Sequence, residues 1–155
     1  MKEVDIEYEI YIGAPVESVW NALSNPAMVK KLYYGSVLRS TFEPGSAMEY
    51  VGPGPQGPET VHIYGKIVQF RKNQEFTHTC KVGSAYGADR INFESRVSYK
   101  LEAVGKTTKL SILHNSWMAG DPAYTNTKIG WPMVMSALKS AVESGMDLDF
   151  GDRGH

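Results

Sequence analysis

The sequence predicts an α+β fold in which an antiparallel sheet of about seven strands packs against one long C-terminal helix. Two observations carry this prediction. Residues 36–117 mostly repeat with a period of two, broken by turn residues, and short turns join neighbouring strands of an antiparallel sheet. Residues 126–145 have the spacing of an amphipathic helix, and this one long helix must cover the inner face of the sheet.

The N-terminal segment predicts one strand followed by two short helices. Apolar and acidic side chains alternate over residues 4–12, which is typical of a strand with one buried and one exposed face. Apolar residues then recur every three or four positions within residues 13–26, and Pro26 lies beyond the end of this first helix. Residues 26–35 are expected to form the second short helix.

The middle of the chain is expected to form the remaining strands. Hairpin turns are expected around Gly45 and Gly105, between apolar runs of period two. The glycine- and proline-rich residues 52–59 are predicted to be a mobile hairpin loop, with a cavity lid as the less favoured interpretation. The strands are predicted at residues 36–41, 47–51, 60–70, 74–82, 91–103 and 109–117.

The closing helix carries a tryptophan and a methionine on its apolar face. Pro132 is predicted at the first helical position and Gly145 just past the helix end. Trp131 and Met135 belong to the face that grips the sheet, where core packing and ligand contact are equally favoured. We expect Met135 to border a ligand cavity, so that Met135→Ala costs less than ~2 kcal/mol of stability and weakens ligand binding.

Composition and charge narrow the class of protein. The 155 residues suit one domain, expected to span residues 1–145, with a flexible tail at residues 146–155. The formal net charge of -1, with dispersed charges, argues against nucleic-acid binding. The single cysteine cannot form an internal disulfide, and no run approaches the ~20 apolar residues of a membrane span. Because the N-terminal segment lacks a signal-peptide pattern, we expect a cytoplasmic protein.

Four segments, taken in their order, resemble a known family. Residues 14–26, 65–79, 95–116 and 130–143 are similar to the bacterial homologues of the activator of the ninety-kilodalton heat-shock chaperone's ATPase. That family lies in the START-like, birch-pollen-allergen-like superfamily, also called SRPBCC. The resemblance, which spans residues 4–145, implies a helix-grip fold in which a curved sheet wraps around the closing helix and leaves an apolar cavity. It also implies binding of lipids, aromatic polyketides or other hydrophobic molecules, with cyclases, hydrolases or oxygenase components as a minority.

Strand parity predicts which side chains face the closing helix. In each strand the alternating apolar set is expected inside, and the acids of opposite parity are expected outside, which leaves the interior without a carboxylate. These acids are Glu49, Glu75, Glu94 and Glu102. The predicted ligand-binding residues are Met48, Tyr50, Phe76, His78, Cys80, Phe93, Val97, Tyr99, Ile112, His114, Trp117, Trp131, Met135 and Leu138.

The interior histidines decide whether chemistry is expected. His78 and His114 are the only predicted interior groups suited to acid–base catalysis. We favour core histidines satisfied by hydrogen bonds, then a polar contact for a ligand, and only then catalysis. Zinc needs three or four converging ligands, and a strand is expected to separate His78 and Cys80 from His114. The sequence therefore predicts no catalytic residue, no metal site and no cofactor.

The predicted function is non-catalytic binding of a hydrophobic, lipid-like or aromatic small molecule. Residues 84–90 and 117–128 are candidates for the mouth of the cavity. Two alternatives come from other classes of function. One is an enzyme that acts on a polyketide-like or ester substrate through His78 or His114, and the other is a module that contacts a chaperone or forms a homodimer without a ligand.

Overall fold

The strands form a single antiparallel sheet. In this computed structural model, residues 3–32, 35–87 and 92–150 are described. Within these ranges, seven strands pair in the order β1-β7-β6-β5-β4-β3-β2. Their bounds are β1 (Ile6–Ile12), β2 (Val37–Ser40), β3 (Ala47–Gly54), β4 (Gly57–Arg71), β5 (Glu75–Val82), β6 (Ser95–Val104) and β7 (Thr107–Asn115).

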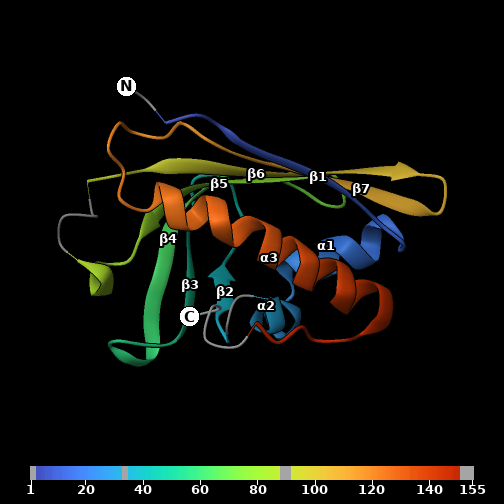
Figure 1. The fold of residues 1–155 in the computed structure, drawn as a ribbon, viewed down its shortest axis with the longest axis horizontal. Helices are drawn as coiled ribbons and strands as arrows, with labels where there is room; N and C mark the ends of the chain where they lie inside the picture. Colours follow the sequence, from blue (N-terminus) through green and yellow to red (C-terminus); the bar gives the residue numbers. More distant parts are fainter. Residues whose placement is uncertain (1–2, 33–34, 88–91, 151–155) are drawn as a thin grey trace.

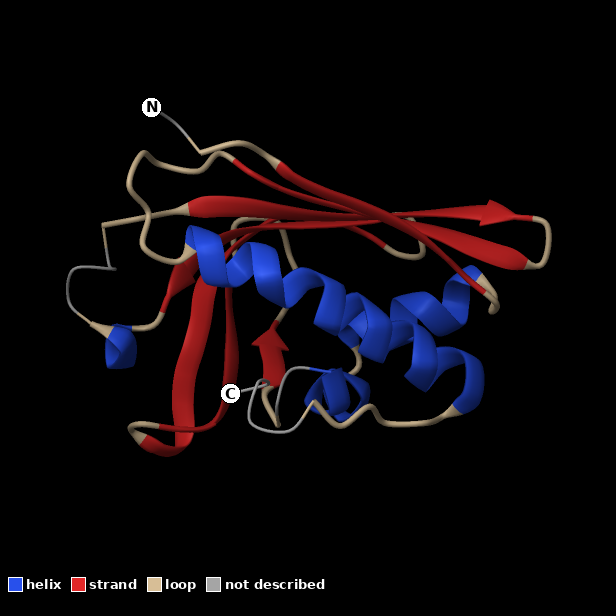
Figure 2. Cartoon of the chain, viewed as in Figure 1, coloured by secondary structure: helices blue, strands red, loops and turns tan. Residues whose placement is uncertain are grey.

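A long helix crosses one face of this sheet. The helices are α1 (Val16–Ser24), α2 (Pro26–Leu32) and α3 (Tyr124–Ser144), with a short 3₁₀ helix, η1 (Ser84–Tyr86), after β5. β3 and β4 turn away from the direction of β1, β6 and β7, so the sheet curves around the N-terminal half of α3 (Figure 1). The two short helices lie beside the C-terminal half of α3 (Figure 2). The predicted helix-grip α+β fold is confirmed.

The central strands bring two histidines to the same level of the sheet. Burial alternates along β6 and β7, as expected when one face of each strand packs against the helix. Val97 in β6 pairs with His78 in β5 on one side and with His114 in β7 on the other. Two strand spacings therefore separate the two histidines, or about 10 Å, and both side chains face α3.

Glycine permits the sharp curvature between β4 and β5. A Cβ atom built on Gly65 would lie 2.0 Å from the Thr79 carbonyl oxygen, so no larger residue fits there without a backbone shift. The pairing register of these strands also shifts between Ile67 and Gln69. Such irregularities bend a sheet and increase its twist, and this bend lets β3 and β4 reach the side of α3.

α3 contains a proline that sequence reasoning placed at its first helical position. The structure shows Pro132 inside the helix, which begins eight residues earlier, at Tyr124. Proline has no N–H, so the Lys128 carbonyl four residues before it loses its helical partner. The Tyr8 hydroxyl of β1 donates a hydrogen bond to that oxygen at 3.2 Å. The helix ends as predicted at Gly145, whose φ of 71° is left-handed.

Two other segments differ from the sequence prediction. Most of residues 52–59 belongs to the paired ends of β3 and β4, because the hairpin closes tightly at residues 55–56. β6 begins at Ser95, so Phe93 precedes the strand instead of lying within it. Of the predicted tail, residues 151–155 lie outside the described residues, and Phe150 packs against the core. Within the described ranges, no helix is long and apolar enough to cross a bilayer.

Candidate functional site

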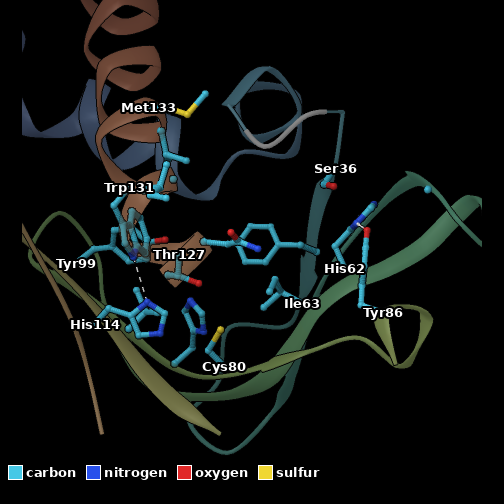
Figure 3. A pocket seen from close by; sticks show the side chains of 18 of the residues that line it. Ser36, His62, Ile63, Cys80, Tyr86, Tyr99, His114, Thr127, Trp131 and Met133 are labelled. Carbon is cyan, nitrogen blue, oxygen red and sulfur yellow. Dashed lines mark hydrogen bonds between the residues drawn. The ribbon is translucent and has the colours of Figure 1, made fainter. Parts of the chain in front are cut away.

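A cavity of about 910 Å³ opens between the N-terminal half of α3 and strands β3 to β7. Trp131, Tyr99 and His114 lie at one end of it, and His62 and Tyr86 lie at the other (Figure 3). Among the described residues that line it, none is Asp, Glu, Lys or Arg. The cavity therefore offers aromatic and apolar surface with a few neutral polar groups, which is typical of sites for small apolar molecules.

The structure divides the sequence-predicted site residues into three groups. Seven of them line this cavity: Tyr50, His78, Cys80, Val97, Tyr99, His114 and Trp131. Phe93 and Trp117 line a much smaller pocket of about 30 Å³ on the other side of His114. The remaining residues are buried in the core and do not line the cavity: Met48, Phe76, Ile112, Met135 and Leu138. A ligand-binding role for any of these residues stays a prediction.

Met135 is the clearest case of a residue placed in the core instead of along the cavity. It is 3% exposed and belongs to the core cluster, whereas Met133 and Val134 line the cavity. The cavity faces the N-terminal half of α3, and Met135 lies on a different side of the helix from Met133. Truncation of Met135 to alanine should therefore cost more stability than the sequence alone suggested.

Several cavity residues escaped sequence reasoning because they lie at turns, bulges and helix positions outside the apolar stripe. Pro53, Gly54 and Pro55 border the cavity from the hairpin that was expected to be a mobile loop. His62 lies on β4, near a register shift between β3 and β4, so parity assigned it no side. The sequence did point to two of the lining residues, because Tyr86 and Thr127 belong to the two segments predicted to form the mouth of the cavity. Residues 88–90 of the first of those segments lie outside the described residues.

His114 is held by three hydrogen bonds and a stacked ring. The indole N–H of Trp131 donates to His114 Nδ1 at 3.1 Å, and His114 Nε2 lies 2.7 Å from Ser95 Oγ. An indole N–H can only donate, so Nδ1 must carry a lone pair and Nε2 must carry the proton. The Trp117 indole donates to the His114 carbonyl oxygen at 2.9 Å and stacks on the imidazole at 4.2 Å between ring centroids.

His78 has the opposite tautomer. Its Nδ1 lies 2.7 Å from the Thr79 carbonyl oxygen, which can only accept, so Nδ1 carries the proton. Its Nε2 therefore carries a lone pair, and this buried atom has no hydrogen-bond partner among the described residues. The rings of Phe76, Tyr50 and Tyr99 surround the imidazole, with centroids 5.2, 6.2 and 6.3 Å away.

Both interior histidines stay neutral at physiological pH. Burial, which penalises the charged imidazolium, lowers the pKa of His78 to about 4 despite its hydrogen bond to the Thr79 carbonyl. Burial and, to a smaller extent, the nearby His78 lower the pKa of His114 to about 3. Protonation of His114 would also place an N–H against the Trp131 N–H. The site therefore presents fixed, uncharged imidazoles.

A polar contact joins three segments at the other end of the cavity. The Tyr86 hydroxyl hydrogen-bonds His62 Nδ1, and His62 Nε2 lies 3.0 Å from the Pro53 carbonyl oxygen. Because that oxygen can only accept, Nε2 carries a proton, and in the neutral form of the ring Nδ1 accepts from the Tyr86 hydroxyl. This contact ties η1 to the β3–β4 hairpin beside the mouth. Gly54 packs against it so closely that a Cβ would lie 2.8 Å from His62 Cε1.

The cavity wall also contains a thiol, that of Cys80. Burial raises the pKa of Cys80 to about 12, and Asp121 and Glu94 raise it, while a hydrogen bond with Ser95 lowers it. At neutral pH the residue therefore holds a protonated thiol, which is a weak nucleophile. Within the described residues, no group of three or more His, Cys, Asp or Glu side chains is arranged to hold a metal ion.

Comparison with protein families gives one match over most of the chain. Residues 13–143 match the model of the family described as "Activator of Hsp90 ATPase homolog 1-like protein". No curated protein shows a significant match to this chain.

Three solved structures illustrate the likeness in fold. A crystal structure of a Mesorhizobium loti protein has a TM-score of 0.74 and 18% identity, covering 94% of this chain and 100% of its own. The Aha1 dimer of Colwellia psychrerythraea, solved in solution, has a TM-score of 0.67 and 21% identity, covering 92% and 98%. An HSP90 activator of Plasmodium falciparum has a TM-score of 0.66 and 19% identity, covering 83% and 88%. At these identities the likeness shows the fold alone.

Proposed function

Because the chain belongs to the Activator of Hsp90 ATPase homolog 1-like family, whose fold grips a helix in a curved sheet, we propose that it binds a hydrophobic small molecule without chemical conversion. The observation that carries this proposal is the cavity of about 910 Å³ between α3 and the sheet. Its volume falls within the ~300–1,000 Å³ range of sites that enclose small organic ligands. None of its described lining residues is Asp, Glu, Lys or Arg, so an apolar ligand displaces no charged side chain from water.

The chemistry of the lining supports binding over catalysis. A general base at neutral pH works best with a pKa near 7, whereas burial holds the pKa values of His78 and His114 at about 4 and about 3. Both nitrogens of His114 are already hydrogen-bonded, to Ser95 and Trp131. Among the described lining residues, none is a carboxylate that could orient a catalytic imidazole. His78 and His114 are therefore poorly suited to acid–base turnover.

Trp131 provides the test of ligand binding. Its side chain lines the cavity, whereas Trp20 packs against Phe70 in the core, with ring centroids 4.9 Å apart. We expect a ligand from a panel of flavonoids, fatty acids and sterols to change the tryptophan emission, because it replaces water beside the Trp131 indole. Trp131→Phe should remove most of this change, and titration of the panel by fluorescence measures it.

The matched control is Trp20→Phe, which should retain the ligand-induced change because Trp20 lies outside the cavity lining. Native mass spectrometry of freshly purified protein gives an independent measurement of any small molecule that copurifies. A panel without effect on the emission, together with a spectrum of bare protein, would contradict the proposal.

A second candidate function is contact with a protein partner. The family description names an activator of a chaperone ATPase, and two structural neighbours are an HSP90 activator and an Aha1 dimer. Large apolar side chains also remain exposed on the described surface, such as Tyr11, Met118 and Ile129. A chaperone or a second copy of the chain would be the partner, and contact of this kind does not require the cavity.

A further inference from the structure

The cavity wall contains one buried polar atom whose bonding is incomplete. His78 is 2% exposed, lines the cavity, and has an Nε2 atom without a partner among the described residues. Leaving a buried polar atom unpaired is energetically costly, because the atom has lost its water without gaining a partner. The other interior histidine shows no such deficit, because both ring nitrogens of His114 are paired. Among the described lining residues, His78 is therefore the one imidazole with unused bonding capacity, and it lies on the central strand of the sheet.

The backbone fixes what this atom can bind. The Thr79 carbonyl oxygen accepts the Nδ1 proton, and the tautomer cannot reverse without two acceptors facing each other at 2.7 Å. The low pKa of His78, which follows from its burial, keeps the second proton off the ring at neutral pH. Nε2 is therefore a hydrogen-bond acceptor only, and it requires an O–H or N–H group as its partner.

Neighbouring side chains do not meet this requirement. The cross-strand neighbour of His78 in β6 is Val97, which has no polar side-chain atom. The indole N–H of Trp131 is already donated to His114. Phe76, two residues before His78 on the same face of β5, contributes only an aromatic ring, 5.2 Å away between centroids. No described residue donates a hydrogen bond to Nε2 in this structure, so a donor from outside the protein can satisfy this atom.

The same surroundings disfavour an anionic ligand. Among the described lining residues, none is Lys or Arg, and the imidazole of His78 is neutral. A carboxylate would lose its water without gaining a cation, and its oxygens would face the lone pair of Nε2. A neutral ligand with a hydroxyl or N–H group meets neither penalty, and its apolar part can pack on the rings of Tyr50, Tyr99 and Trp131.

We propose that His78 is the polar anchor of the cavity, and that the ligand is an uncharged apolar molecule whose hydroxyl or N–H group donates to His78 Nε2. Fatty acids and other carboxylates are then the wrong class, whereas phenols, enols and alcohols with a large apolar body are the right one. This inference rests on the proposed binding function, which the experiment below tests separately.

Three pyrene derivatives separate the two claims. At pH 7, 1-hydroxypyrene offers a donor, 1-methoxypyrene has the same rings without a donor, and pyrene-1-carboxylate is an anion. Fluorescence anisotropy measures the dissociation constant of each. We expect 1-hydroxypyrene to bind about fivefold more tightly than 1-methoxypyrene, the effect of one neutral hydrogen bond. Pyrene-1-carboxylate should bind at least ~30-fold more weakly than 1-hydroxypyrene, because its charge is buried without a partner.

Two leucine variants in β5 assign the difference to His78. His78→Leu removes the acceptor and should reduce the affinity ratio of 1-hydroxypyrene to 1-methoxypyrene to about one. The control variant Phe76→Leu introduces leucine two positions earlier, at a core position that does not line the cavity. It should keep the wild-type affinity ratio. If His78→Leu does not fold, ¹⁵N spectra of the wild-type imidazoles decide, because 1-hydroxypyrene should shift the His78 Nε2 resonance and 1-methoxypyrene should not.

The outcomes distinguish failure of the inference from failure of the proposed function. If none of the three probes binds, the cavity does not take apolar molecules and both claims fall. If 1-methoxypyrene binds as tightly as 1-hydroxypyrene, the cavity binds ligands but His78 does not anchor them, since water already satisfies Nε2. Tighter binding of pyrene-1-carboxylate would also overturn the inference, because it would require a cation in the cavity.

Discussion

Lowering the pH from 7 to 5 is expected to reduce the free energy of unfolding by roughly 4 kcal/mol through the two buried histidines. An unfolded histidine has a pKa near 6.5, whereas burial lowers the folded values to about 4 for His78 and about 3 for His114. Between these values the unfolded chain takes up protons that the folded chain cannot. The contribution of the two neutral histidines to the free energy of unfolding is therefore fully present above pH 6.5. It falls as the pH drops toward 4, and at pH 5 the loss is about 2 kcal/mol per histidine.

Urea denaturation at pH 7 and pH 5 measures this loss as a change in midpoint at constant slope. His78→Leu should remove about half of the pH dependence, because one of the two titrating groups is gone. Phe76→Leu, which deletes core volume from the same strand without removing an ionisable group, should keep all of it. A wild-type loss below about 1 kcal/mol would contradict the assignment of both imidazoles as neutral in the folded state.

Met135→Ala is expected to destabilise the protein by about 2–5 kcal/mol, whereas Met133→Ala should cost less than about 1 kcal/mol. Met135 is 3% exposed in the core, so its truncation leaves an internal void. Met133 is only half-buried and lines the cavity, so its truncation enlarges a space that already exists. The two variants make the same chemical change on the same helix, two residues apart.

The effects on ligand affinity should have the opposite order. Met133→Ala removes a cavity contact and should weaken binding of 1-methoxypyrene about threefold or more, in line with the transfer energy of the lost atoms. Met135→Ala should leave that affinity within about twofold, provided that the variant is measured below its unfolding midpoint. Urea denaturation and fluorescence anisotropy together give both quantities. Equal stability costs for the two methionines would show that the core and the cavity wall are not separate on this helix.

Strand parity was a good guide where pairing is regular. It placed Val97, Tyr99 and His114 inside, and the structure buries all three. Strand parity cannot predict which face a side chain occupies at a bulge, because a one-residue slip exchanges the two faces of a strand. Tyr50 and Val51 are consecutive residues and are both buried, since the β3–β4 register shifts between them. His62 and the hairpin beside it lie in this irregular part of the sheet, which explains why they were missed.

The closing helix shows a second limit of sequence reasoning. The apolar stripe identified Trp131, Met135 and Leu138 as buried, which the structure confirms. It could not tell which of them borders empty space, because helical periodicity gives the direction of a side chain but not the distance to the opposing sheet. Pro132 was misplaced for a related reason. The Lys128 carbonyl that it leaves unpaired finds its donor in Tyr8, 120 residues away in sequence.

The sequence by itself determined the α+β class, the antiparallel sheet, the closing helix and an interior without carboxylates, because each of these follows from local periodicity and turn residues. Only the tertiary structure decided where the sheet curves away from α3 to leave a cavity, and which imidazole lies in its wall with an unpaired nitrogen. Tautomers and pKa values depend on burial and on partners such as Thr79 and Trp131, and contacts between separate strands and helices arise only when the chain has folded.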